Sequence, residues 1–242
     1  MKLGTSFFSF IVGGAALATA YETVEEFARL SGIDVSGHQK NVDWGAQKKA
    51  GVKFAYVKAT EGTSYRSPYF TQQYDGSYRI GMIRGAYHFA RPDRASGAAQ
   101  ANYFLQYGGK WTADGKTLPG MLDIENNDVS GGDTCYGISP VKMVSWIKDF
   151  SDTYHSKTGR YPAIYTNTPW WKKCTGNSAM FGKNPLVIAN WGRTPEPLPA
   201  GWTQWTIWQY TDKPIDHDYF NGDDAALARF AKGTSNALVI NQ

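Results

Sequence analysis

The sequence predicts an α/β fold: a single modified (β/α) barrel, TIM-like, in which the helices of the second half are reduced or missing. Two observations predict it. Short β-rich segments alternate with segments of helical periodicity over most of the 242 residues. After about residue 160 the gaps between strand candidates shorten and fill with Trp, Pro and Gly. An open doubly wound sheet is the alternative.

Eight segments have the length and composition of strands. They are rich in β-branched, aromatic and other apolar residues and are bounded by turn-forming residues. In chain order they are residues 32–37, 53–60, 83–90, 120–125, 162–167, 185–191, 205–211 and 214–220. Eight strands are the number that closes a barrel of this kind.

The clearest helix candidate lies between the fourth and fifth strands. Ser139 can cap it, Pro140 suits its first turn, and Gly159 suits its end. Apolar residues repeat along it at helical spacing, namely Val141, Val144, Ile147, Phe150 and Tyr154. Weaker candidates are residues 42–51, 68–80 and 94–107, and helices after residue 160 are expected to be short or missing.

The first twenty residues have the layout of a secretory signal peptide. Lys2 precedes an apolar stretch that ends in small residues, so cleavage after Ala20 or after Ala18 is expected. The protein is therefore expected to be secreted and extracellular. The predicted organisation is a signal peptide at 1–20, an N-terminal stub or propeptide at 21–31, a catalytic barrel at 32–232 and a C-terminal tail at 233–242.

Export allows the two cysteines to be interpreted. A cysteine pair in an oxidising compartment is more often bridged than catalytic or metal-bound, which predicts a disulfide between Cys135 and Cys174. In the chain-entropy model, such a bridge restrains the unfolded state by about 4 kcal/mol. Two free buried thiols are the alternative.

The composition excludes several classes of partner and cofactor. A formal net charge of +4 is too small to indicate nucleic-acid binding. The four histidines form neither an HExxH motif nor a Cys/His cluster, and no phosphate-binding glycine loop is present. We expect no cofactor, no metal and no stable membrane association, and we expect a monomer.

The fourth strand candidate ends in an unusual pair of acids. Side chains alternate along a strand, so Asp123 and Glu125 share one face while Leu122 and Ile124 share the other and pack outward. Two residues of strand separate the Cα atoms of the two acids by about 6.6 Å, close enough for each charge to oppose ionisation of the other. A protonated carboxyl beside an ionised one suits glycosidic bond cleavage. Taken alone, the pair could equally be a cap or a solvated loop edge.

Other polar residues fall near the ends of predicted strands. Asp34 lies in the first, Glu61 directly follows the second, Tyr87 and His88 lie in the third, and Asp216 lies in the eighth. In a parallel barrel the carboxyl ends of the strands meet at one rim, so these groups are expected to converge there. Convergence favours a catalytic interpretation of the acid pair.

Together the motifs GIDVSGHQ, FAYVKATEG, GAYHFARP, MLDIE, AIYTN, IANW and WQYTDKPIDHDYFNG resemble glycoside hydrolase family 25, the Chalaropsis-type lysozymes. The resemblance runs in order from about residue 32 to residue 231. It implies a β/α barrel with reduced second-half helices. It also implies a peptidoglycan substrate and hydrolysis of the β-1,4 link after N-acetylmuramic acid.

The resemblance also implies roles for the acids. Glu125 matches the general acid/base. Asp123 matches a partner that steers the 2-acetamido group of the substrate into attack on the sugar carbon, so no enzyme carboxylate need bond the sugar. Asp34 and Asp216 match supporting acids of the catalytic groove.

Five further residues fall on matched motifs and are expected to bind substrate: Glu61, Tyr87, Tyr165, Trp191 and Gln209. Aromatic rings at strand ends can stack on sugar faces, and hydroxyl or amide groups can bond sugar oxygens. The alternatives are an ion pair or cap for Glu61, core packing for the three rings, and a structural strand-end amide for Gln209.

Two other functions remain as alternatives. Chitinases that use paired acids at a barrel strand end carry a D-x-x-D-x-D-x-E motif, and Met121 stands here where the Asp before D-x-E is required. A non-catalytic glycan-binding barrel would be favoured if one of the paired acids were missing, but both are present.

Overall fold

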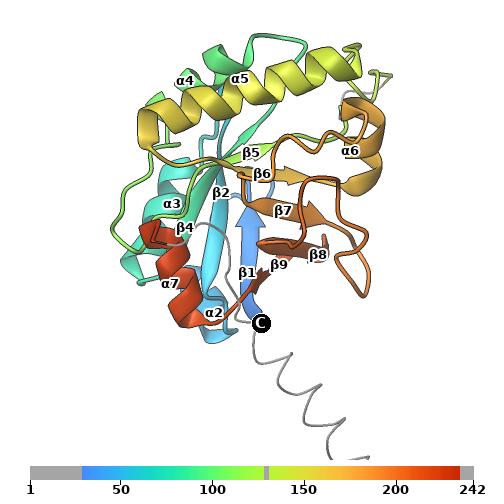
Figure 1. Cartoon of the computed structure of the whole chain (residues 1–242). Helices are drawn as coiled ribbons and strands as arrows, with labels where there is room; N and C mark the ends of the chain where they lie inside the picture. The colour runs from blue at the N-terminus through green and yellow to red at the C-terminus, as the bar shows by residue number, and fades with distance from the viewer. Residues whose placement is uncertain (1–28, 128–130, 235–242) are drawn as a thin grey trace, which may run out of the picture.

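The computed structural model describes residues 29–127 and 131–234, which form one sheet whose main strands close into a barrel (Figure 1). The strands in these ranges are β1 Arg29–Val35, β2 Phe54–Glu61, β3 Tyr65–Arg66, β4 Ile83–Phe89, β5 Met121–Asp123, β6 Ala163–Thr166, β7 Leu186–Ala189, β8 Ile207–Thr211 and β9 Asp216–Asn221. The helices are α2 Trp44–Lys49, α3 Phe70–Arg79, α4 Gly97–Gln106, α5 Pro140–Thr158, α6 Thr168–Thr175 and α7 Asp224–Lys232.

The barrel closes through eight strands in the order β1-β9-β8-β7-β6-β5-β4-β2, with β2 returning to β1. Each contains part of one predicted strand segment, so the predicted barrel is confirmed. The short strand β3 was not predicted, and it forms a hairpin on the end of β2 by pairing Arg66 with Thr60.

The direction of the last strand corrects the prediction of a parallel barrel. Strand β9 runs antiparallel to both β8 and β1, whereas the other neighbouring barrel strands are parallel. Asp216 is its first residue and pairs with Asp34 of β1. An antiparallel strand starts at the rim where its neighbours end, so Asp216 still reaches the carboxyl rim.

The start of β1 corrects the predicted domain boundary. The strand begins at Arg29, and residues 29–31 pair with residues 219–221 of β9. These three residues therefore belong to the barrel and not to a separate stub. The predicted signal peptide, residues 21–28 of the stub and residues 235–242 of the tail lie outside the described residues.

The predicted helices are present. Helix α5 follows Ser139, has Pro140 in its first turn and ends at Gly159, which adopts the left-handed conformation with φ 72°. Ser139 occupies the cap position, but its side chain makes no capping hydrogen bond. Helices α2, α3 and α4 lie within the weaker candidates, and the later helices α6 and α7 have only 8 and 9 residues, as expected.

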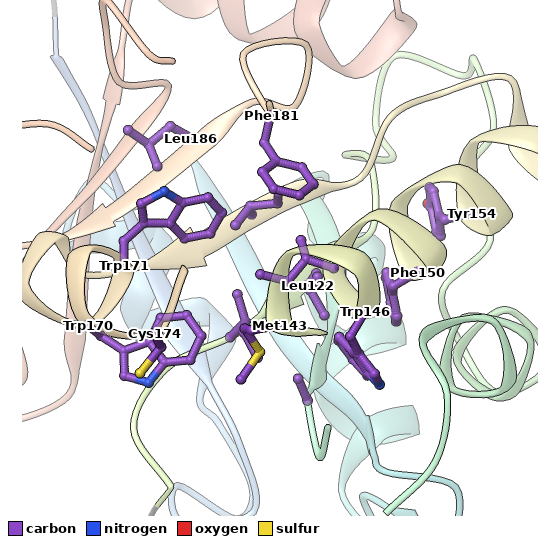
Figure 2. Close-up of a cluster of buried hydrophobic side chains, with 14 of the residues drawn as sticks. Leu122, Met143, Trp146, Phe150, Tyr154, Trp170, Trp171, Cys174, Phe181 and Leu186 are labelled. Carbon is purple, nitrogen blue, oxygen red and sulfur yellow. The ribbon is translucent and has the colours of Figure 1, made fainter. Parts of the chain in front are cut away.

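The outer face of the barrel packs against helices (Figure 2). Leu122 of β5 lies in a buried cluster with residues of α5 and α6, including Met143, Phe150 and Trp171. Ile124 joins the same cluster, so the predicted outward packing of both residues is confirmed. Where second-half helices are short, tryptophans of the β7–β8 connection and of β8 complete the cluster: Trp202, Trp205 and Trp208.

The inner face forms a separate core. Met121 of β5 packs there with Phe54, Tyr56 and other inward-facing residues. Helix α7 contributes Leu227 and Phe230 to this cluster. The interior is therefore filled, and inward-facing polar side chains are displaced towards the rim.

Cys135 and Cys174 are bridged, with their Cα atoms 5.3 Å apart, which confirms the predicted disulfide. The bridge ties the segment after β5 to α6. In the described part of the chain, none of the helices combines the length and apolar character needed to cross a membrane.

Candidate active site

The alternation along β5 places the acid pair on the inner side of the barrel. Met121 faces the inner core, whereas Leu122 and Ile124 face the outer core. The backbone N–H of Ile124 donates to the carbonyl of Tyr165 at 3.0 Å, so sheet pairing continues past the last residue of β5. Asp123 and Glu125 therefore share the inward face at the rim, with Asp123 7% exposed and Glu125 less buried.

Asp123 is the carboxyl whose protonation the site favours. Burial raises the pKa of Asp123 well above its usual range, and the charge of Glu125 raises it further, while Lys58 opposes the shift. The Oδ1 atom of Asp123 is buried and has no hydrogen-bond partner among the described residues. The sequence predicted that one member of the pair resists ionisation, and the pKa of Asp123 is shifted in that direction.

Asp34 lies in the same electrostatic cluster. Burial and the neighbouring Asp216 raise the pKa of Asp34 to about 8, and the charge of Glu125 adds to this effect. The pKa of Asp216 is also raised, first by burial and then by Asp212. Acids from β1, β5 and β9 therefore act on one another, which is the convergence that the strand-end positions predicted.

Gln209 of β8 links this cluster to two aromatic residues. Its Oε1 atom accepts hydrogen bonds from the Tyr165 hydroxyl and from the Trp191 indole N–H, both at 3.0 Å. Its Nε2 atom donates to Oδ2 of Asp34 at 2.8 Å. An indole N–H can only donate, so the Gln209 amide must direct its oxygen towards Trp191 and its NH₂ group towards Asp34.

The three predicted aromatic residues differ in exposure. Trp191 is 60% exposed, so its ring offers a stacking surface and is not a core residue. Tyr87 and Tyr165 are 7% and 8% exposed. The pKa values of both tyrosines are raised by burial and by the acid cluster, which places the two rings in the wall beside the acids.

Glu61 makes an ion pair, as its alternative interpretation anticipated. Its carboxylate lies 2.8 Å from Nζ of Lys58 and 3.6 Å from a guanidinium nitrogen of Arg91. Its side chain is 25% exposed. Glu61 therefore lies at the rim but is held by cations.

Sequence reasoning missed two charged residues of this region. Lys58 lowers the pKa of Asp123, and it shares the inward face of β2 with Phe54 and Tyr56, a spacing of two that could have indicated its direction. Asp218 is 2% exposed, and its pKa is raised by burial, by Asp34 and by Asp216. The same spacing from Asp216 could have found it.

His88 lies elsewhere, which corrects its expected position near the groove. It is fully buried on the outer face, stacked on Phe150, and its ring nitrogens lie 2.8 Å from Thr60 Oγ1 and 2.9 Å from Gln100 Oε1. Burial lowers its pKa to about 4. Among the residues with described positions, no group of three or more His, Cys, Asp and Glu side chains could hold a metal ion.

A closed barrel whose carboxyl rim carries interacting acids beside an exposed indole has the architecture of a barrel glycoside hydrolase. The comparison with known families identifies which glycoside hydrolase family it is. The model of the glycosyl hydrolases family 25 matches residues 33–219. The chain therefore belongs to glycoside hydrolase family 25, as its motifs indicated.

Related proteins cover nearly the whole chain. An N,O-diacetylmuramidase of Arthroderma benhamiae is 47% identical, over 96% of this chain and 100% of its own length. An N,O-diacetylmuramidase of Chalaropsis sp is 46% identical, over 84% of this chain and 100% of its own. The solved structure of a muramidase from Acremonium alcalophilum superposes with a TM-score of 0.82 at 50% identity, covering 84% of this chain and 99% of that one.

Proposed function

We propose that this protein is a secreted lysozyme that hydrolyses the β-1,4 bond between N-acetylmuramic acid and N-acetylglucosamine in bacterial peptidoglycan. Membership of family 25 and the muramidase names of the relatives support this substrate. The observation that carries the proposal is the pair Asp123 and Glu125 on one inward face at the rim, with the pKa of Asp123 raised by burial and by Glu125.

The pair is proposed to share one proton. Two interacting acids titrate together, so the proton can move from Asp123 to Glu125 when substrate binds. Glu125 then protonates the glycosidic oxygen as the bond from the anomeric carbon to that oxygen breaks. The ionised Asp123 accepts the N–H of the 2-acetamido group and directs its carbonyl oxygen onto the anomeric carbon.

The second step reverses the proton transfer. The carboxylate of Glu125 takes a proton from a water molecule, whose oxygen bonds the anomeric carbon and releases the acetamido oxygen. The negative charge of Asp123 stabilises the cationic ring formed between the two steps. The substrate supplies the nucleophile, so the carboxylate-separation rule for retaining glycosidases does not apply.

The neighbouring residues are proposed to hold the sugar. Trp191 offers an exposed ring for stacking, and its N–H anchors it to Gln209. Tyr87 and Tyr165 form the wall beside the acids. Asp34 and Asp216 support the groove, whereas Glu61 positions Lys58 by its ion pair.

Replacement of Glu125 tests the acid assignment. Glu125→Gln removes the transferable proton while keeping the shape, so lysis of bacterial walls should fall at least about a hundredfold, the usual contribution of a general acid. The exposed Glu196 supplies the matched control Glu196→Gln, which should keep parental activity. A Glu125→Gln variant as active as the parent would contradict the assignment.

The proposal also includes export and a monomeric state. N-terminal sequencing of secreted protein should begin after Ala18 or Ala20, or after residue 28 if the preceding segment is removed as a propeptide. Light scattering should give the mass of one chain. A retained initiator Met1 on protein collected outside the cell would contradict signal-peptide cleavage.

A further inference from the structure

Asp218 lies at the boundary between the apolar interior and the acid cluster. In β9 it pairs with Gly32 of β1 on one side and with Gln209 of β8 on the other. Phe54 fills the space beside Gly32, since a Cβ atom added there would lie 2.2 Å from its ring. Asp218 therefore has aromatic rings on one side and the acids of the rim on the other.

The charges that face Asp218 disfavour its ionisation. Asp34 from β1 and Asp216 from its own strand both raise its pKa, after burial as the largest cause. From β2 it faces Tyr56, whose raised pKa reflects burial first and Asp218 among its smaller causes. Strand β8 offers the uncharged amide of Gln209.

Within residues 29–127 and 131–234, no cation offsets a negative charge at this position. No salt bridge within the described residues includes Asp218, and its buried Oδ1 atom has no hydrogen-bond partner among them. A buried carboxylate without a partner is costly, so a carboxyl group in this setting stays neutral. A neutral carboxyl differs from a carboxylate because it can donate a hydrogen bond.

We propose that Asp218 is a positioning residue that remains protonated and donates its hydroxyl hydrogen to a carboxyl oxygen of Asp34, which holds Asp34 against Gln209. This inference rests on the proposed function, because Asp34 matters only if the groove is catalytic. It extends the chain of hydrogen bonds from Trp191 through Gln209 to Asp34 by one residue. Asp218 itself touches neither sugar nor reacting atoms.

Two substitutions test whether Asp218 acts as a hydrogen-bond donor, which a carboxylate cannot do. Asp218→Leu keeps the branched shape of the side chain and removes the donor, whereas Asp218→Asn retains an N–H donor and cannot ionise. Without this hydrogen bond Asp34 is no longer held against Gln209, so the Leu variant should lose about tenfold in kcat with little change in KM. The Asn variant should recover most of that loss.

The pH profile supplies a readout that a merely structural role would not move. A donated hydrogen bond favours the ionised form of Asp34, so its loss in Asp218→Leu should move the limb of the profile set by Asp34 to higher pH. Asp218→Asn should leave that limb near its parental position. Asn as inactive as Leu, or Leu with the parental kcat and pH profile, would overturn the proposal.

Infrared spectroscopy tests the protonation state without activity. At neutral pH the parent should show the carbonyl band of a protonated carboxyl, and Asp218→Asn should lose this band. The control Asp224→Asn, at a side chain that is 70% exposed, should retain it. Absence of that difference would show an ionised Asp218. If the parent cleaves no peptidoglycan, the proposed function fails, whereas a failed infrared result with an active parent rejects only the role of Asp218.

Discussion

Ionisation of Asp34 destabilises the folded protein. The pKa of Asp34 is about 8 in the folded protein and near 4 in a free aspartate, so between these pH values the folded state binds a proton that the unfolded state does not. The protonated side chain of Asp34 therefore stabilises the folded state fully below the unfolded pKa. This stabilisation is lost as the pH rises through the folded pKa. The acid cluster weakens the fold in the range where it is ionised.

Asp34→Asn should therefore stabilise the protein at alkaline pH while impairing catalysis. Asn cannot ionise, so the free energy of unfolding at pH 9 should rise by about 1–3 kcal/mol, a value reduced from the full shift because Asp34 is only half-buried. At pH 3.5 most of the gain should vanish, since the parental acid is largely protonated in both states. Urea unfolding at the two pH values checks this, and a variant less stable than the parent at pH 9 would contradict it.

Trp191 should contribute to substrate binding more than to folding. It is 60% exposed, so Trp191→Ala should leave the melting temperature nearly unchanged. Loss of ring stacking should raise KM by about tenfold. Trp191→Phe keeps a ring and loses the N–H, so it should restore most of the affinity. Steady-state kinetics on soluble wall fragments measures both, and a parental KM for the Ala variant would exclude a stacking role.

At the residue scale, the sequence predicted which residues lie in the site better than it predicted the hydrogen bonds among them. Strand-end positions brought Asp34, Asp123 and Asp216 into one cluster, because strand alternation and barrel closure are regular. The bonds of Gln209 could not be predicted, since they depend on the loop that carries Trp191. His88 was misplaced because it directly follows Tyr87, and neighbouring strand residues face opposite sides.

At the element scale, β9 was the one barrel strand whose direction was not foreseen. Residues 212–215 separate β8 from β9. A parallel pair needs a crossover of about a dozen residues or more, so this short connection already requires an antiparallel pair. The strand nevertheless delivers Asp216 to the rim, because its first residue lies opposite Asp34.

The disulfide should stabilise the element that follows β5 without taking part in catalysis. It bridges residues 39 apart in the sequence, so replacing both Cys135 and Cys174 by Ser should cost about 2–4 kcal/mol of unfolding free energy. The kcat of the folded variant should stay within about twofold, because neither sulfur lies among the acids of the rim. Denaturant unfolding of the unreduced parent and the double variant checks the first statement; equal stability would contradict it.

At the scale of the whole molecule, the barrel separates stability from chemistry. The interior is filled by apolar residues such as Phe54 and Met121, and α7 packs on them, whereas the acids gather at the opposite, carboxyl rim. The overall architecture was predictable because strand and helix periodicity repeat along the chain. In the sequence, the replacement of second-half helices by tryptophan-rich loops was visible only as a change in spacing and composition. How these tryptophans pack on the outer face of the barrel could be seen only in the folded structure.

The cleavage chemistry of the acid pair is the central element of the proposed function. Purified peptidoglycan and chitin should be digested in parallel with the parent and with Asp123→Asn, and the sugar at each new reducing end identified by mass spectrometry. The parent should release N-acetylmuramic acid ends from peptidoglycan, and the variant at least about a hundredfold fewer, since it lacks the charge that stabilises the transition state. N-acetylglucosamine ends released from chitin alone, or full turnover by Asp123→Asn, would contradict the proposed function.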